Sequence, residues 1–388
     1  MDTGEAQEQQ DAVLGRRARR AVPLIAAALA VAVVTGLLYL RPAAPHLAGV
    51  AAPSPSAPTL EPTFIPAYDF VTPELGWAVL QRPTEASGEL EDFWIFRTQD
   101  GARHWTLQQH GSSISPWPGI TMTFFDRSHG VIALGGSFAE RTSDGGQHWN
   151  FVALPQVTGT QITFADPMHG WFAGVQLVEG KAGTEQLYRT ADGGGTWERL
   201  PDPPATNLTF RNAGEGWGAV QDGKGGAGTV YATWDGGLTW DRVPLTPAGP
   251  PPDYPTYFET FVRLLPKAGV VVGVGGLGFV SFDRGTTWKQ LAELPSGSFA
   301  DVAFQDATHW WTMPFGNLYR SSDAGASWHH VVLRLDNWNY GVGVVDARHA
   351  WALLDTVGTT GPFVRGTALA LTSDGGANWS YANVPNPG

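Results

Sequence analysis

The chain has 388 residues, a formal net charge of −12, 49 glycines and 17 tryptophans, and it contains no cysteine. The lack of cysteine excludes a disulfide framework, a thiolate zinc site, an iron–sulfur cluster and a lipid-bearing N-terminal cysteine. The glycines do not follow the three-residue period of collagen, and together with many tryptophans they are typical of an all-β repeat protein.

Residues 21–40 are predicted to anchor the chain in a membrane. They carry no charge, and as a helix they would span about 30 Å, the thickness of one hydrocarbon core. Four arginines lie in residues 16–20 and one follows at Arg41, so the positive-inside rule predicts a cytoplasmic tail at 1–20 and an extracytoplasmic remainder. The stretch is longer than the apolar part of a signal peptide, which favours an uncleaved signal anchor over cleavage near Ala52.

Residues 41–63 are predicted to form an extended linker. They contain six prolines and six alanines, a composition that resists packing. The four acids and four arginines of residues 1–20 cancel, so the whole charge of −12 belongs to residues 41–388. A domain this acidic has no electrostatic footprint for a nucleic acid, so we expect no nucleic-acid partner. The only membrane contact that we expect is through residues 21–40.

One motif, Ser/Thr-x-Asp-x-Gly-x-x-Trp, recurs seven times, with Ala102 replacing Gly in the first copy. We call each copy an Asp turn. Its aspartates are Asp100, Asp144, Asp192, Asp235, Asp283, Asp323 and Asp374, and its tryptophans are Trp105, Trp149, Trp197, Trp240, Trp288, Trp328 and Trp379. Asp accepts hydrogen bonds from nearby backbone amides, Gly permits a left-handed backbone, and Trp supplies a large surface to bury. We therefore predict that the motif is a self-contained structural turn.

A second segment precedes each Asp turn and reads as strand, polar turn, strand, as in TFADPMHGWFAG. Each repeat is therefore predicted to be four strands, A to D, with a short A–B turn and an Asp turn between C and D. The repeated Asp-x-x-His pairs in these A–B turns are Asp126/His129, Asp166/His169, Asp306/His309 and Asp346/His349. Because each pair belongs to a different repeat, we favour a turn-stabilising role over a metal site.

The Asp turn is similar to the Asp-box, or bacterial neuraminidase repeat. Together with the F-x-D-x-x-H-G-W segment, it resembles the photosystem II stability/assembly factor family over about residues 66–383. The resemblance implies an all-β, seven-bladed propeller of four-stranded blades, with the Asp-boxes on the outer rim and outside any active site. We assign this propeller to residues 64–388. The chain departs from lipoprotein members of the family because it has no cysteine to carry a lipid.

No residue pattern indicates catalysis, a cofactor or a metal site. A sialidase is rejected because Phe64-Ile65-Pro66 stands where such enzymes carry an Arg-Ile-Pro segment. The arginines Arg97, Arg141, Arg189 and Arg320 instead lie three residues before an aspartate of an Asp turn. A glycoside hydrolase using two carboxylates stays open as the alternative, with Asp253, Glu259, Asp336 and Asp355 as available acids.

The B–C and D–A connections are predicted to share the face opposite the Asp turns. They vary in length, with long examples at 81–92, 108–119, 175–186, 220–229, 244–257, 332–340 and 355–367. They hold aromatic residues that the repeat does not explain: Trp117, Tyr254, Tyr257, Trp338 and Tyr340. Exposed aromatics on variable loops suit binding, so these five are the candidate binding residues.

The sequence thus predicts a membrane-anchored, extracytoplasmic propeller that binds a protein or glycan as a scaffold or assembly module. Catalysis by a carbohydrate-active enzyme is the alternative, and the ectodomain is expected to be monomeric. Two modes of ring closure are open: residues 59–66 could add to the last blade, or the first and last blades could pack face to face.

Overall fold

The computed structural model describes Leu60 and twelve further pieces of the compact unit Ser56–Gly388. These pieces are residues 64–82, 90–114, 120–134, 138–178, 181–220, 228–245, 260–274, 277–291, 302–312, 317–331, 338–357 and 365–387. The predicted tail, membrane span and most of the linker lie outside them. The part that is described contains no helix with the length and hydropathy to cross a membrane.

The described residues form seven four-stranded antiparallel sheets, and each sheet is built from four consecutive strands. Blade 1 contains β1 (Ile65–Phe70), β2 (Gly76–Arg82), β3 (Leu90–Thr98) and β4 (Thr106–Ile114), and blade 2 contains β5 (Ile120–Phe124), β6 (Gly130–Leu134), β7 (Phe138–Thr142) and β8 (Asn150–Ala153). Blade 3 contains β9 (Thr158–Phe164), β10 (Gly170–Val178), β11 (Lys181–Thr190) and β12 (Glu198–Arg199). Blade 4 contains β13 (Asn207–Phe210), β14 (Gly216–Val220), β15 (Thr229–Thr233) and β16 (Asp241–Val243).

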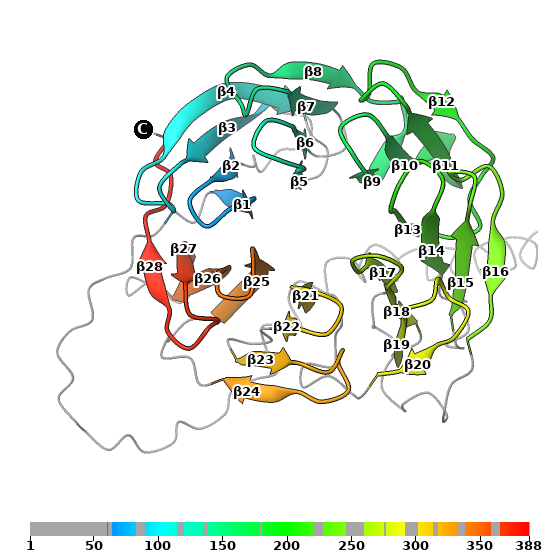
Figure 1. Ribbon diagram of the computed structural model, residues 1–388. Helices are drawn as coiled ribbons and strands as arrows, with labels where there is room; N and C mark the ends of the chain where they lie inside the picture. The colour runs from blue at the N-terminus through cyan, green and yellow to red at the C-terminus, as the bar shows by residue number, and fades with distance from the viewer. Residues whose placement is uncertain are drawn as a thin grey trace, which may run out of the picture. The chain divides into compact units, whose positions relative to one another are not determined.

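The last three blades follow the same order. Blade 5 contains β17 (Phe261–Leu264), β18 (Val270–Val274), β19 (Leu277–Ser281) and β20 (Lys289–Gln290). Blade 6 contains β21 (Val302–Phe304), β22 (Trp310–Thr312), β23 (Leu318–Ser321) and β24 (His329–Val331). Blade 7 contains β25 (Trp338–Val344), β26 (Ala350–Val357), β27 (Arg365–Thr372) and β28 (Ser380–Ala382). Figure 1 shows the sheets around one centre, with the first strand of each blade innermost and the fourth outermost. The fold is therefore the expected seven-bladed propeller.

The core is divided into seven apolar layers, one between each pair of neighbouring blades. Strand geometry explains this division, because successive side chains point to opposite faces of a sheet. On β2, Trp77 and Val79 join the layer shared with blade 2, whereas Ala78 and Leu80 join the layer shared with blade 7. The central strands consequently read as continuous apolar runs, and all five residues of β6 are buried.

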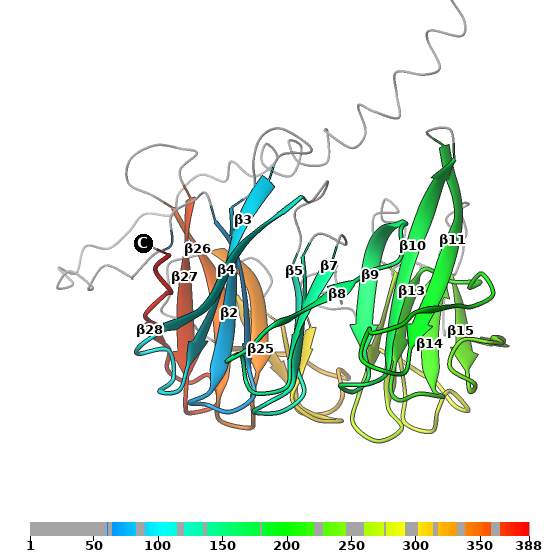
Figure 2. The same ribbon diagram turned by 90° about the horizontal axis from the view of Figure 1, so that it is seen from above.

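Several of the segments predicted as long loops contain strand at their described ends, and 175–186 is almost entirely strand. Residues 175–186 belong mainly to the β10–β11 hairpin, whose strands end at Val178 and resume at Lys181. Residues 332–340 likewise include the start of β25 at Trp338. Figure 2 shows β10 and β11 extending beyond the neighbouring blades on one side of the ring. Antiparallel pairing continues there through a β-bulge near Val175, which sequence patterning did not reveal.

The ring closes by both of the modes left open by the sequence. Leu60 forms an isolated antiparallel bridge with Thr367 on β27, with N···O distances of 2.9 and 3.3 Å. Blades 1 and 7 also pack face to face, because Leu60, Phe64 and Tyr68 share an apolar layer with Leu369. Leu60 thus adds one bridge to the last blade.

Candidate functional site

Each Asp turn closes on itself through a repeated set of hydrogen bonds. In blade 3 the Thr190 hydroxyl donates to Asp192 Oδ1 at 2.7 Å and accepts the Gly194 N–H at 2.8 Å. The same Oδ1 accepts the Thr196 N–H at 2.9 Å. Hydrogen bonds from Thr196 and Thr190 lower the pKa of Asp192 to about 2, so this carboxylate is ionised at neutral pH. It serves its own turn, as the sequence predicts for the motif.

The four Asp-x-x-His pairs lie in A–B turns and have the same geometry as one another. Asp166 Oδ1 accepts the backbone amides of Met168 and His169 at 2.8 and 2.9 Å, and Asp166 Oδ2 lies 2.9 Å from His169 Nδ1. The pairs at 126/129, 306/309 and 346/349 repeat these contacts. Among the described residues, no group of three or more His, Asp or Glu side chains could hold a metal ion.

The A–B turns and the Asp turns lie on the same face of the ring, which we call the Asp-turn face. In every blade, the backbone N–H of the residue directly after the Asp-turn aspartate donates to an A–B turn carbonyl of the same blade. Examples are Gly193 N–H to Met168 O and Gly375 N–H to Arg348 O, both at 2.8 Å. Figure 2 shows the short turns of the blades gathered at one edge of the ring.

The predicted binding aromatics are not brought together by any described contact. Trp117, Tyr254 and Tyr257 lie outside the described residues, as do the candidate acids Asp253, Glu259 and Asp336. Trp338 and Tyr340 fall in β25, where only the backbone is described, and Trp338 is paired in register with Asp355 on β26. These five aromatics stay predictions.

Tryptophans on the second strand of blades 1 and 3 join these blades to the next. Trp171 of β10 is 2% exposed, stacks on Phe210 of blade 4 at a centroid distance of 3.7 Å, and donates from Nε1 to Gly236 O at 2.9 Å. Trp77 makes the same contacts with Phe124 and Gly145 of blade 2. The glycine carbonyl that receives this indole bond belongs to the Asp turn of the following blade.

The four arginines singled out in the sequence act at the same junctions. Arg141 Nη1 donates to Asp192 O and Gly193 O, both at 2.8 Å. Arg320 Nη1 donates to Gly375 O at 2.5 Å, and its Cζ lies 4.5 Å from the ring centroid of Trp311. Each arginine of blades 1, 2, 3 and 6 therefore lies beside the Asp turn of the next blade, with Arg97 and Arg189 in the equivalent places. We call this contact the arginine clamp.

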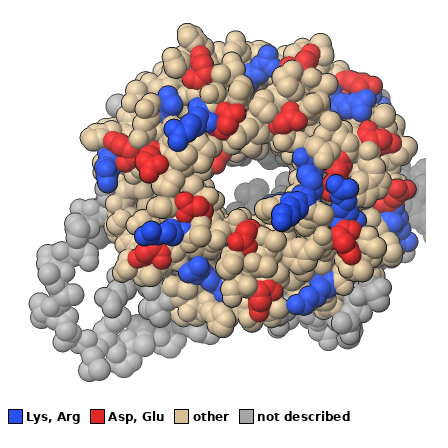
Figure 3. All heavy atoms as spheres, viewed as in Figure 1, with Lys and Arg blue, Asp and Glu red and all other residues tan. Residues whose placement is uncertain are grey.

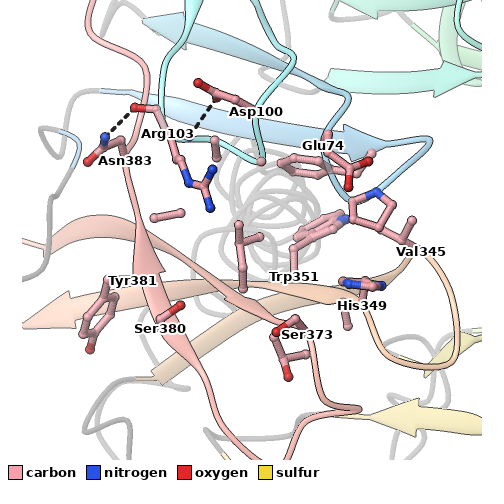
Figure 4. Close-up of a pocket in the computed structure, with 18 residues that line it drawn as sticks. Glu74, Asp100, Arg103, Val345, His349, Trp351, Ser373, Ser380, Tyr381 and Asn383 are labelled. Atoms are coloured by element: carbon pink, nitrogen blue, oxygen red, sulfur yellow. Dashed lines mark hydrogen bonds between the residues drawn. The ribbon is translucent and has the colours of Figure 1, made fainter.

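Blade 7 meets blade 1 without a clamp, because Leu371 occupies the position three residues before Asp374. Leu371 lies opposite Trp351 in the β26–β27 register, just as Arg320 lies opposite Trp311. A cavity of about 470 Å³ opens there, which we call the seam cavity. Its walls are the A–B turns of both blades, the blade 1 Asp turn and β28, and Figure 4 shows Glu74, Arg103 and Trp351 around it.

Sequence reasoning missed the seam cavity. The available signal was the residue three before each Asp-turn aspartate, which is arginine in four blades and leucine in the seventh. That difference has no meaning until the structure shows that this position faces the next blade.

Charges of both signs are interspersed over the face of the ring that Figure 3 shows, around a central opening. On the junction between blades 4 and 5, the 4% exposed Glu215 pairs with Arg211 at 2.9 Å and with Arg284 at 3.3 Å. Arg211 also donates to Leu265 O and Gly269 O of blade 5. These cations therefore hold two blades together.

Three carboxyl groups have raised pKa values because burial disfavours their charged forms. Burial raises the pKa of Asp69 on β1 to about 6, that of Glu185 on β11 to about 7, and that of Glu140 on β7. Asp69 Oδ2 accepts the Phe124 N–H of blade 2 at 2.8 Å, and Glu140 Oε1 accepts from Gln109 of blade 1 at 3.1 Å. Two of the three thus bridge neighbouring blades, which is a structural role.

We expect the Asp69→Asn variant to be more stable than the native protein above pH 6. The folded pKa of Asp69 exceeds the ordinary value of 3.8, so the native state binds the extra proton and loses stability as pH rises from about 4 to 6. A shift of about two units corresponds to at most about 3 kcal/mol. The asparagine keeps an acceptor for the Phe124 amide but never ionises.

The measurement is urea unfolding of both proteins at pH 4 and pH 7.5. The difference in unfolding free energy between variant and native protein should grow in favour of the variant between these values. A difference that does not change with pH would contradict the assignment.

The comparisons with known proteins agree with this architecture. No family model matches the chain. The sequence is 28% identical over 313 residues to the photosystem II assembly lipoprotein Ycf48 of Synechococcus sp. (strain CC9902), covering 69% of this chain and 79% of that protein. The chain is therefore a homologue of Ycf48 that folds as a seven-bladed propeller of four-stranded blades.

Two solved structures are also similar. YCF48 bound to a D1 peptide aligns with a TM-score of 0.51 and 19% identity, covering 82% of this chain and 93% of that one, and this likeness supports the fold alone. The GH74 enzyme of Niastella koreensis aligns with a TM-score of 0.32 and 15% identity, covering 82% of this chain and 62% of that one. The second likeness is too low to bear on function.

Proposed function

We propose that this protein is a membrane-anchored, extracytoplasmic propeller that binds a protein partner and acts as an assembly or scaffold module, without catalysis. The observation that carries the proposal is the 28% identity to Ycf48 over 313 residues. That relative is named as an assembly lipoprotein, and a YCF48 structure contains a bound D1 peptide. A protein ligand is therefore favoured over the glycan that the sequence left open.

The geometry of the described residues supports a binding role over a catalytic one. The Asp-turn carboxylates accept hydrogen bonds within their own turns, and two of the three carboxyls with raised pKa bridge blades. In this proposal the seven Asp turns are Asp-boxes, whose task is to hold each blade closed. A rigid ring with satisfied turns suits a scaffold that presents its faces to another protein.

The anchoring part of the proposal rests on the sequence of residues 1–63. An uncharged stretch of twenty residues follows four arginines, and a linker with six prolines follows it. This order would place the propeller outside the membrane on a spacer. An anchor in this place would hold the propeller at the membrane in a chain with no cysteine to lipidate.

The topology is tested by cysteine labelling, which is clean here because the chain has no native cysteine. In intact cells, a membrane-impermeant maleimide should label Ser143→Cys, an exposed position in the blade 2 Asp turn. It should label Gln7→Cys only after lysis. Labelling in the opposite order, or release of the propeller into the medium, would contradict the anchored topology.

The partner class is tested with the full-length protein solubilised in detergent. We expect it to bind one defined protein reversibly at a fixed stoichiometry when both are purified, and to release no sugar from a panel of polysaccharides. Hydrolysis of a polysaccharide by the purified chain would overturn the proposal in favour of the glycosidase alternative.

A further inference from the structure

The seam cavity is best understood by comparing the seven junctions between blades. At four of them a guanidinium group from one blade lies against the Asp turn of the next. An ideal Cβ placed on Gly145, Gly193, Gly236 or Gly375 would meet a guanidinium atom of the preceding blade within 4 Å. The arginine clamp is thus a recurring way to satisfy and cover these turn carbonyls.

The junction from blade 7 to blade 1 has the same turn but no guanidinium group. Of the described residues, only Pro73 O lies within 4 Å of an ideal Cβ on Gly101, at 3.2 Å. Trp351 is also only partly buried, whereas its counterparts Trp77, Trp217 and Trp311 have no exposed surface. Trp351 and the blade 1 Asp turn are both present at this junction, and the space between them is the seam cavity.

The other two junctions without a clamp are filled in other ways. Between blades 5 and 6, the residue after the Asp-turn aspartate is the buried Ala324, and the fully buried Trp310 of the same blade packs over the next residue, Gly325. Between blades 4 and 5, the residue after the aspartate is Arg284 of blade 5 itself, whose Nε lies 3.3 Å from the buried Glu215 of blade 4. A missing arginine therefore does not by itself leave a cavity, which makes the blade 7–blade 1 junction distinct.

The charges around the seam cavity favour a cation. Asp100 and Glu74 line it, and the Asp100 carboxylate is held ionised by its hydrogen bonds to His104. Arg103 also lines the cavity, and its backbone is fixed by the N–H donated to Asp100 Oδ1 and by the carbonyl that accepts from Asn383. His349 also lines the cavity, with its Nδ1 2.9 Å from Asp346 Oδ1. The acidic side chains of the lining thus outnumber its one arginine.

We propose that the seam cavity is a binding site for an arginine side chain supplied by another molecule, which takes the place of the missing clamp. The guanidinium group lies over Trp351, as that of Arg320 lies over Trp311, and donates to the backbone carbonyls of the blade 1 Asp turn. This inference makes the proposed function more specific. It rests on that function in one respect, because the molecule that supplies the arginine is taken to be the protein partner. The site itself is a property of the propeller.

The test uses acetyl-arginine amide as the probe, with acetyl-citrulline amide as its uncharged isostere. Binding to the full-length protein is followed by calorimetry and by the indole N–H signals of the tryptophans. We expect saturable binding of the arginine probe, at least about tenfold weaker binding of the citrulline probe, and movement of the Trp351 signal, assigned with Trp351→Phe.

Leu371→Arg is the decisive variant, because it supplies the clamp from within the chain. It should raise the melting temperature and weaken binding of the arginine probe at least about tenfold. Unchanged probe binding by this variant, or no saturable binding by the native protein at millimolar probe, would overturn the proposal.

Arg320→Leu is the reciprocal variant and keeps the proposal testable if Leu371→Arg does not fold. It removes the clamp between blades 6 and 7, where the residue after the aspartate is Gly375, a glycine like Gly101 at the seam. A second site should therefore open, and the stoichiometry should rise from one probe to two. A stoichiometry of one would count against the clamp analogy. Because the probe is a small molecule, these results are independent of whether the proposed protein partner is found.

Discussion

Replacing Trp171 with alanine should lower the free energy of unfolding by about 3–5 kcal/mol, the usual cost of removing a large buried aromatic side chain. The indole is 2% exposed, stacks on Phe210 of the next blade and donates to Gly236 O. The substitution would leave a cavity in the layer between blades 3 and 4 and remove a hydrogen bond to a buried carbonyl. Both effects act on the same junction.

The measurement is urea unfolding of Trp171→Ala beside Trp351→Ala. Trp351 holds the equivalent place on blade 7 but borders the seam cavity, so its removal creates less new empty volume. We expect the second variant to lose clearly less stability than the first. Equal losses would mean that the two tryptophans are equally well packed, which would contradict the comparison of junctions.

The fold could be predicted from the sequence because the residues that form each blade lie close together in the chain and repeat in every blade. The Ser/Thr-x-Asp-x-Gly-x-x-Trp motif closes a turn within nine residues, and the structure forms that turn in all seven blades. The apolar runs before it become the central strands. Local hydrogen bonds and a period of two are sufficient to define such a unit.

The contacts between blades could not be predicted in the same way. Arg141 stands beside its own Asp turn in sequence, yet its guanidinium serves Asp192 and Gly193, 51 and 52 residues later. The sequence identified the four arginines as lying near the rim, but spacing within one repeat does not say which neighbour a side chain reaches. The significance of Leu371 was hidden for the same reason.

The sequence placed the candidate binding residues on the connections between strands, whereas the seam cavity lies elsewhere. The aromatic residues Trp117, Tyr254 and Tyr257 belong to the connections between strands, outside the described residues, whereas the seam cavity is on the Asp-turn face. Sequence reasoning favoured variable loops because the repeat does not explain their residues. It could not detect a site that arises because blade 7 carries Leu371 where four other blades carry an arginine.

The Phe64→Ala variant should lose about 3 kcal/mol or more and should do so by opening the ring where its ends meet. Phe64 is 6% exposed, meets Trp94 edge to face at 5.5 Å, and lies under the guanidinium group of Arg82 at 4.7 Å. It holds the segment that carries Leu60, whose backbone bridges Thr367 on the last blade. A cavity at Phe64 therefore weakens the packing that keeps this bridge in place.

Hydrogen exchange distinguishes opening of the ring from general destabilisation. The Thr367 N–H donates to Leu60 O at 3.3 Å, so its exchange reports the bridge directly. Phe172→Ala is the matched control, because Phe172 is 1% exposed in the layer between blades 2 and 3. We expect both variants to lose comparable stability, but only Phe64→Ala to speed exchange at Thr367 beyond its global loss. Equal acceleration in both would mean that the ring opens only as a whole, and that the Leu60 bridge contributes no separate closure.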